Sequence, residues 1–459
     1  MTSDERGSDD GMDEALALVG RRPRPAGPAG QDPASGPAVP PPQTSPGHRH
    51  GTAWPEARAA AARAGTTAAA TRRPVPVPLG QALGRVLAEP LRALTDLPSF
   101  DTSAMDGWAV AGPGPWRTAP EGPEGSVLAG HATTAELADG HAVRIATGAR
   151  VPAGATAVVR AEHSRTDAAG QLHARREVVQ GQDIRPRGQE CRSGDRLMPA
   201  GSLVTPAVLG LAAAAGYDEL TTYPRPRVEV LVLGDELLTS GLPHEGLIRD
   251  ALGPLLDPWL CALGADVLGV RRIGDDAEEL YRAVTGSAAD VVVTTGGTAS
   301  GPVDHVHPVL AKAGATLLVD GVRVRPGHPM LLAALGDPAD RYLVGLPGNP
   351  LAAVSGLLTL AEPLLRALAG HPAAGSVPFS VPVRDGIQGH PQDTRLVPVL
   401  DRDGAAVPLR YSGPAMLRGI ATADGMAVVP PGGARPGQAL DVLDLPWTAP
   451  ATGQGVCFT

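Results

Sequence analysis

The chain has 459 residues, with 39 Lys and Arg against 48 Asp and Glu, so its formal net charge is −9. This length predicts about three domains of roughly 100–200 residues each, and the acidic balance argues against nucleic-acid partners, which need a basic surface. Cys191, Cys261 and Cys457 are too few and too far apart for a disulfide framework or zinc site, which fits a reducing cytoplasm. No apolar run reaches the ~18 residues of a membrane span. We therefore expect a cytoplasmic protein with no membrane partner.

The first 52 residues are rich in Pro, Gly, Ser and charged side chains. Such a segment buries too little apolar surface to offset its chain entropy, so we predict a disordered tail at 1–52. An interaction segment is the functional alternative for this tail.

Residues 53–224 predict an N-terminal domain with a β-rich domain inserted at about 114–184. Alanine-rich 55–70 favours a helix, apolar residues near helical spacing from Leu79 onward predict another within 77–87, and 203–216 predicts a third. Short alternating runs separated by glycines predict the strands of the insertion, at 142–145, 157–160 and 176–179.

Residues 225–375 alternate between strand and helix signals. Strands are predicted at 228–233, 266–270 and 290–293, and helices at 247–263, 277–285 and 351–368. This alternation predicts a parallel sheet with helices on both faces. Short Val- and Pro-rich runs from 376 to 459 predict a small β-barrel or sheet domain.

The stretch Asp290–Asp304, DVVVTTGGTASGPVD, organises the central domain. Its strand ends in a turn that contains Gly296, Gly297 and Ser300, and paired glycines allow a backbone to approach a ligand closely. In an open α/β sheet, ligands bind beyond the carboxyl ends of the strands. An ordinary strand-to-helix turn and an anion-binding loop both fit this pattern.

Carboxylates recur just after predicted strands, at Asp235, Glu236, Asp275 and Asp304. One such acid is usually a helix N-cap, whereas four at one sheet edge suit Mg²⁺ bound together with phosphate. Arg325 and His328 are expected near the same edge, at which the long helix after Gly348 and Asn349 would point its N-terminus. His305 and His307 are expected to be helix-start residues rather than metal ligands.

Several motifs together resemble the molybdopterin molybdotransferases, the MoeA and gephyrin E-domain family. The resemblance covers about residue 53 to the end. Its motifs, in family order, are FDTSAMDGWAV at 100–110, RIATGARVPAGATAVV at 144–159, IRPRGQE at 184–190, GDEL at 234–237, TTGGTASGPVD at 294–304, RPGHP at 325–329 and GLPGNP at 345–350.

The resemblance implies an enzyme of molybdenum cofactor biosynthesis that acts as an elongated homodimer of four-domain protomers. Its reaction would be Mg²⁺-dependent insertion of molybdate into adenylylated molybdopterin, with release of AMP. The site would be a cleft where the sheet domain of one subunit faces the β-rich part of the other. The matched positions imply catalytic roles for Asp106, Thr147, Glu190, Glu236, Asp275 and Asp304, with Asp275 and Asp304 holding the metal. Substrate binding is implied for Gly296, Gly297, Ser300, Arg325, His328, Gly348 and Asn349.

Departures from the family pattern gather where molybdate would bind. Glu190 stands where Asp is usual, Ala299 replaces a serine, Arg325 replaces a lysine, and His328 stands where a second lysine is common. The Gln-Gly-Ser segment of the last domain appears here as 412–415. An oxyanion site with fewer donors binds more weakly. The alternative is therefore a catalytically impaired paralogue that acts as a pterin-nucleotide-binding or scaffold protein.

Overall fold

The computed structural model describes residues 51–118, 126–130, 136–299, 304–336, 340–372 and 379–447. The predicted tail lies outside these ranges except for its last two residues. Thr52 already belongs to strand β1 (Thr52–Ala53), so ordered structure includes the final residue assigned to the tail.

The central domain is built on a six-stranded sheet with the order β18-β15-β19-β23-β22-β20. The first four strands are parallel, and β22 and β20 extend the sheet in antiparallel fashion. The predicted α/β domain is confirmed, but its sheet is mixed rather than wholly parallel. The strands are β15 (Arg227–Leu233), β18 (Asp266–Ile273), β19 (Val291–Thr295), β20 (Thr316–Asp320), β22 (Leu331–Leu335) and β23 (Arg341–Leu346).

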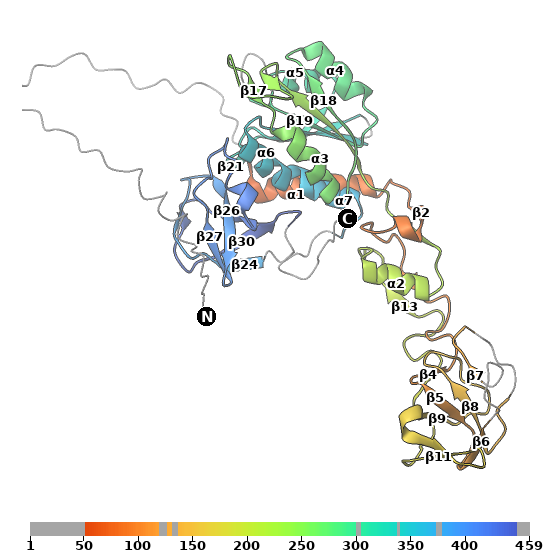
Figure 1. Ribbon diagram of the computed structural model, residues 1–459. Coiled ribbons are helices and arrows are strands. Elements are labelled where there is room, and N and C mark those ends of the chain that lie inside the picture. Colours follow the sequence, from red (N-terminus) through yellow and green to blue (C-terminus); the bar gives the residue numbers. More distant parts are fainter. Residues whose placement is uncertain are drawn as a thin grey trace, which may run out of the picture. The chain divides into compact units, whose positions relative to one another are not determined.

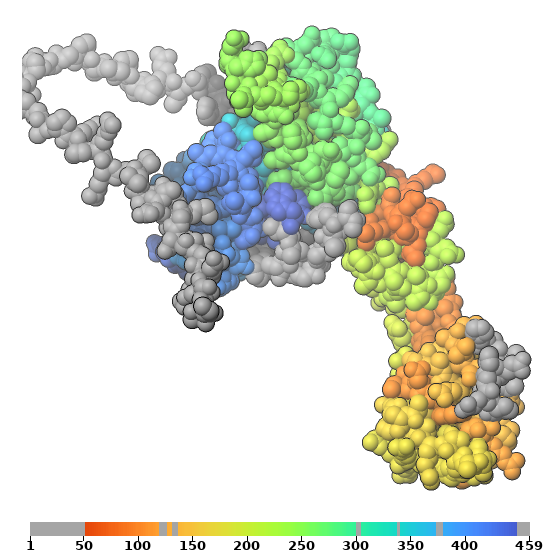
Figure 2. Space-filling model, in the orientation of Figure 1, coloured from red at the N-terminus to blue at the C-terminus, as the bar shows by residue number. Residues whose placement is uncertain are grey.

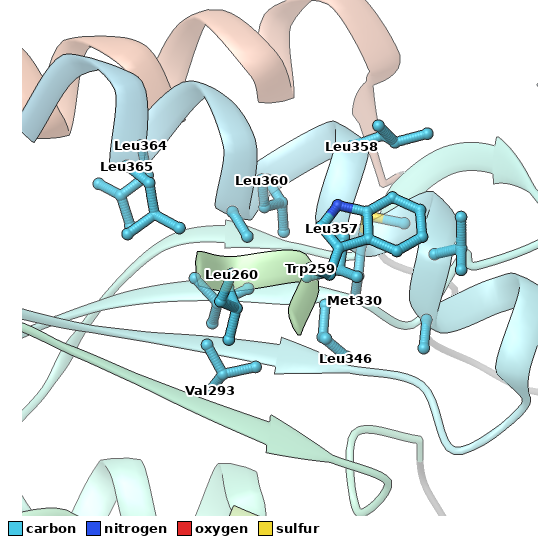
Figure 3. Packing of buried hydrophobic residues seen from close by; sticks show 14 of the residues in the cluster. Trp259, Leu260, Val293, Met330, Leu346, Leu357, Leu358, Leu360, Leu364 and Leu365 are labelled. Carbon is cyan, nitrogen blue, oxygen red and sulfur yellow. The ribbon is translucent and has the colours of Figure 1, made fainter. Parts of the chain in front are cut away.

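Helices cover both faces of this sheet, as predicted. One core joins it to α1 (Trp54–Ala69), α3 (Leu252–Ala262), α6 (Pro350–Gly356) and α7 (Glu362–Leu368). The other core joins it to α4 (Ala277–Gly286) and α5 (Val306–Lys312). Figure 3 shows the first core, in which Trp259 and Leu260 of α3 and the leucines after Gly356 lie beside Val293 and Leu346 of the sheet.

The predicted helix at 351–368 is continuous but contains a π-helical segment, η5 (Leu357–Ala361), between α6 and α7. Helix α1 runs alongside it (Figure 1). Pro350–Leu368 is long and apolar enough to cross a membrane, yet 78% of that window is buried inside the protein. It is therefore a core helix of the central domain.

The predicted helix at 247–263 begins five residues late. Ile248–Arg249 forms strand β17, which pairs with β16 (Leu237–Leu238). The Asp250 carboxylate then accepts hydrogen bonds of 3.0 Å from the backbone N–H groups of Leu252 and Gly253. This side chain stops the strand and starts α3, because it satisfies the first unpaired N–H groups of the helix.

The predicted helix at 77–87 is wrong. β2 (Val75–Pro78) pairs with β14 (Glu219–Thr222), and only a single 3₁₀ turn follows at Leu79–Gln81. Two prolines favour an extended chain here, and Gly84 has a positive φ of 73°.

β3 (Leu91–Arg92) pairs with β13 (Arg196–Met198), and α2 (Pro206–Ala214) confirms the third predicted helix. In Figure 2 the orange surface, which includes β2, borders the yellow-green surface, which includes α2.

The β-rich part is a seven-stranded sheet around β5 (Gly107–Val110), β8 (His141–Ile145) and β9 (Ala157–Arg160). Two of its three predicted strands are confirmed. The strand predicted at 176–179 is wrong: the last strand of this sheet along the chain is β11 (Gln171–Ala174), which lies between β10 and β6, and the chain leaves the sheet after it. The remaining strands are β6 (Trp116–Thr118), β7 (Ser126–Val127) and β10 (Ser164–Thr166).

The C-terminal part forms a small barrel, as predicted. Five strands pair in the order β24-β30-β28-β26-β27, and a bridge between Val383 and Ala406 links the two ends of this series. β21 (Val322–Arg325) and β1 extend the sheet from β26. The barrel strands are β24 (Phe379–Pro382), β26 (Thr394–Arg402), β27 (Ala405–Pro408), β28 (Gly425–Val429) and β30 (Ala439–Asp444).

Candidate active site

The strand order creates a switch point between β15 and β19. From β15 the chain crosses to β18 on one side and then returns to β19 on the other. In doubly wound sheets, the loops at such a point diverge and leave a crevice beyond the carboxyl ends of the strands. The loops that begin at Gly234 and Gly296 flank this crevice.

Close backbone contacts join the loops that begin at Gly234 and Gly296 with the turn at Gly348. A Cβ atom at Gly296 would lie 3.8 Å from the carbonyl oxygen of Leu233, and one at Gly348 would lie 3.6 Å from the Cα atom of Gly296. The N–H of Gly296 donates to the carbonyl of Leu346 at 2.8 Å. Gly296 and Gly297 have φ values of 79° and 64°, which L-residues with side chains rarely adopt. Both glycines are therefore required by the turn itself.

Ser300, one of the predicted binding residues, lies outside the described residues. Thr298, two positions earlier, is buried, and its hydroxyl makes no hydrogen bond within the described part of the chain. The hydroxyl of Thr294, at the end of β19, is also buried and makes no hydrogen bond within the described part of the chain. Buried hydroxyl groups are normally paired, so the loop holds two polar groups whose hydrogen-bonding capacity the described chain does not use.

The predicted acids occupy different local roles. Asp276, not Asp275, caps α4, because its carboxylate accepts from the N–H groups of Glu278 and Glu279 at 2.8 and 2.9 Å. These bonds lower the pKa of Asp276. Asp275 stays exposed beside the cap. Asp235 lies close to the same loop, since a Cβ atom at Gly274 would be 2.7 Å from its carboxylate.

Glu236 and Asp304 complete the predicted acids. Glu236 is exposed and follows Asp235 at the end of β15. Asp304 is partly buried just before α5 and interacts with another residue of the chain. Across the ranges that the structure describes, no group of three or more His, Cys, Asp or Glu side chains is placed to hold a metal ion. His307 pairs with Asp320 at 2.8 Å.

A loop of the C-terminal part accepts hydrogen bonds from the first turn of α6. The carbonyl of Pro414 accepts from the N–H groups of Leu351 and Ala352 at 2.8 and 3.2 Å. The expectation that these N–H groups point at a ligand is therefore wrong for this turn, since they already have an acceptor. Gly348 and Asn349, just before the helix, remain exposed.

The same contact places the barrel loop that contains residues 412–415 beside the site, together with Arg418, which the sequence did not indicate. Arg418 donates to the hydroxyl of Tyr411 at 2.8 Å, and its guanidinium lies 4.4 Å from the centre of that ring. A Cβ atom at Gly413 would lie 3.1 Å from the sulfur of Met416, so the loop packs closely on itself. An exposed cation on a loop far along the chain gives no sequence signal of proximity to the GLPGNP turn.

The RPGHP segment also lies against α6. A Cβ atom at Gly327 would lie 3.0 Å from the carbonyl oxygen of Ala352. Arg325 pairs with Asp393 of the barrel at 2.8 Å, so part of its charge is already compensated. His328 donates from Nδ1 to the carbonyl of Val322 at 2.8 Å, which leaves Nε2 for another partner.

The other predicted residues form a second group, in loops of the β-rich part. The carboxylate of Asp106 accepts from the N–H of Thr147 at 2.7 Å, and this hydrogen bond lowers the pKa of Asp106. Glu190 is exposed, and its N–H donates to the carbonyl of Leu97 at 2.9 Å. The motifs at 100–110, 144–159 and 184–190 thus meet in one place through β4 (Thr102–Ser103), which pairs with β12 (Ile184–Arg185).

The two groups of predicted residues belong to different sheets with separate cores. One carries Gly-rich turns and carboxylates at the edge of a doubly wound sheet. The other carries the hydrogen-bonded carboxylate of Asp106, the hydroxyl of Thr147 and several arginines. The fold defines a multidomain α/β protein whose central domain is a doubly wound sheet with Gly-rich turns at the carboxyl ends of its strands.

Comparison with known proteins identifies the family. Three family models match in chain order: the MoeA N-terminal region (domain I and II) at 53–216, a probable molybdopterin binding domain at 229–367, and the MoeA C-terminal region (domain IV) at 380–445. Molybdopterin molybdenumtransferase 2 of Mycobacterium tuberculosis is 34% identical over 78% of this chain and 91% of that protein. The Nostoc molybdopterin molybdenumtransferase is 31% identical over 70% of this chain and 74% of that protein.

A solved structure agrees with the sequence relatives. The molybdopterin biosynthesis MoeA protein of Pyrococcus horikoshii superposes with a TM-score of 0.66 at 25% identity, covering 84% of this chain and 98% of that protein. The chain belongs to the molybdopterin molybdenumtransferase family of molybdenum cofactor biosynthesis. The predicted resemblance is confirmed, and the alternative of a scaffold or impaired paralogue is not favoured.

Proposed function

We propose that this protein inserts molybdate into adenylylated molybdopterin with release of AMP. The observation that supports this proposal best is the convergence of the Gly234, Gly296 and Gly348 loops at the switch point of the sheet. Such a crevice suits the phosphates of a pterin nucleotide, and the family relationship supplies the nature of the substrate.

The residues of the crevice have separate tasks in this proposal. The turns at Gly296–Gly297 and Gly348–Asn349 bind phosphate through their backbones, and the hydroxyls of Thr294 and Thr298, which the described chain leaves unpaired, can hydrogen-bond to the bound ligand. Arg325 supplies positive charge beside α6, and His328 contributes its Nε2 atom as a hydrogen-bonding group. Fixed donors of this kind stabilise charge that develops as the phosphoanhydride breaks.

Asp275 and Asp304 fit a divalent cation by their donor chemistry. Mg²⁺ is commonly held by one or two carboxylates plus substrate phosphates, so the absence of a larger cluster among the described residues does not conflict with it. Asp275 is available because its neighbour Asp276 provides the helix cap. When bound, the cation neutralises charge on the phosphates and the leaving AMP.

The second group of residues completes the site in a homodimer. Asp106, Thr147 and Glu190 of one subunit would face the sheet edge of the partner, as the family resemblance implies. We place the protein in the cytoplasm, where the other steps of a soluble cofactor pathway would supply its substrate.

Single-turnover assays with adenylylated molybdopterin, Mg²⁺ and molybdate test the proposal by following AMP and metal-loaded cofactor. Asp275→Asn should slow AMP release on the order of a hundredfold, because a charge that balances the cation is lost. Asp276→Asn is the matched control: Asn caps a helix as well as Asp, so its rate should match the wild type. Equal rates for all three proteins would exclude Asp275 from the site, and absence of AMP from the wild type would reject the function.

A further inference from the structure

Two arginines flank the small two-stranded sheet of β4 and β12, and an aromatic ring lies beside one of them. Thr102 of β4 lies opposite Arg185 of β12 on one side and opposite Arg150 on the other, both in antiparallel register. Residues directly opposite in antiparallel strands project from the same face. Arg150 and Arg185 therefore flank Thr102 on one face.

Phe100 lies beside Arg150, in the bend that precedes β4. The guanidinium carbon of Arg150 is 5.7 Å from the centre of the Phe100 ring, which is 41% exposed. The chain has only three Phe residues, so an exposed ring among charged side chains is unusual here.

Arg150 and Arg185 have no ion-pair partner among the residues that the structure describes, whereas the nearby Arg187 pairs with Asp96. The backbone beneath the face is fixed by hydrogen bonds from Ser103 to Ala149 (2.9 Å), from Gly148 to Ser103 (2.8 Å) and from Val151 to Asp101 (2.9 Å). The backbone that carries Phe100, Arg150 and Arg185 is therefore held in place before any ligand binds.

We propose that Phe100, Arg150 and Arg185 bind a flat heterocycle that carries a phosphate. A guanidinium forms paired hydrogen bonds with phosphate oxygens, and an exposed ring offers a stacking surface to any base. The inference rests on the proposed function and extends it: this face holds the heterocycle and phosphate of the nucleotide. Both the adenylate half and the pterin half of the substrate have this chemistry.

Calorimetric titration of the purified full chain with AMP and, separately, with molybdopterin distinguishes the two halves. Arg150→Ala and Arg185→Ala should each weaken binding of one probe by about 10- to 100-fold, as expected for hydrogen bonds to a charged group. Phe100→Leu should weaken binding of the same probe about tenfold, because stacking is lost while apolar volume is kept. Whichever probe is affected identifies the bound half.

Arg165→Ala serves as the control, because Arg165 is an exposed arginine on β10 of the seven-stranded sheet, outside the segments that carry Arg150, Arg185 and Phe100. It should bind both probes like the wild type. Should an alanine variant fail to fold, judged by its thermal midpoint, Arg150→Lys and Arg185→Gln test the same geometry. Unchanged affinity for both probes in all the variants, or no measurable binding to the wild type, would overturn the inference. Wild-type AMP release, measured in parallel, decides the proposed function independently.

Discussion

At the scale of single residues, Arg58 holds two segments together. It donates to the carbonyl of Leu358 within η5 and lies 3.8 Å from the carboxylate of Glu362. A π-helical turn pairs its backbone carbonyls differently from an α-helix. The partly buried guanidinium of Arg58 supplies a donor for the Leu358 carbonyl in this turn. Trp54, one turn earlier, donates to the hydroxyl of Thr359 at 3.0 Å.

Arg58→Ala should lower the free energy of unfolding by about 2–3 kcal/mol, because Leu358 and Glu362 lose a charged donor. Urea unfolding followed by circular dichroism measures this change. Arg63→Ala on the same helix is the control, since Arg63 is exposed, and its effect should stay within about 0.5 kcal/mol. Equal effects of the two substitutions would contradict the role given to Arg58.

His371 makes stability depend on pH. Burial, with a smaller effect of the Arg366 charge, lowers its pKa from 6.5 to about 4. Between these values the unfolded chain binds a proton that the folded chain does not. Stability should therefore fall as pH drops from 6.5 to 4, and this group should have little effect outside that window.

Replacing the imidazole should remove this dependence. Between pH 6.5 and 4 the wild type should lose up to about 3 kcal/mol more than His371→Gln, which shares the background titration of the carboxylates. Urea midpoints at half-unit pH steps give the difference. Parallel curves for the two proteins would show that His371 titrates alike in the folded and unfolded states.

At the scale of elements, α1 and α7 approach each other at a glycine. A Cβ atom at Gly65 would lie 2.5 Å from the carbonyl oxygen of Leu364 and 2.7 Å from the Cβ of Ala367. Both neighbours belong to a helix, so neither can move easily. The sequence shows an alanine-rich helix here, but the place where a methyl group is forbidden depends on its partner.

Gly65→Ala should destabilise the protein by about 1–3 kcal/mol, because the helices must separate. Gly210→Ala in α2 should instead be neutral or stabilise it by up to about 1 kcal/mol, since nothing lies within 4 Å of the added atom and Ala favours helices. Thermal midpoints compare the two variants. The same sign for both would show that contact distance does not decide the outcome.

Errors in the predicted elements share one cause. Apolar spacing at 77–87 and 176–179 was compatible with regular structure, but tertiary pairing decided the outcome. Val75–Pro78 became a strand because Glu219–Thr222, some 140 residues later, supplies its partner. Segments with strong and complete signals, such as α1, β9 and β15, matched closely.

At the scale of the whole molecule, the proposed site draws on both groups of residues. Homodimers with closed symmetry repeat each interface twice, so one dimer would contain two composite sites. Variants altered in different groups should then complement each other. This distinguishes a site shared between subunits from one built within a single chain.

Asp106→Ala and Asp275→Asn should each be nearly inactive alone. After unfolding and refolding together, about half of the dimers should be mixed, each with one intact site, giving about a quarter of wild-type AMP release. Mixing without refolding is the control and should restore little. No recovery after refolding would argue against a site shared in this way.

The sequence by itself determined the family, the α/β character of the central domain, and the candidate residues. These depend on local signals: Gly-rich turns, acids after strands, and several motifs in one order. Only the tertiary structure decided which residues meet. It assigned the helix cap to Asp276 rather than Asp275, supplied the Pro414 carbonyl as acceptor for the first turn of α6, and placed Arg150 beside Phe100 and across Thr102 from Arg185. The reason is physical: turn and helix propensities act over a few residues, whereas capping, pairing and charge compensation join residues that folding alone brings together.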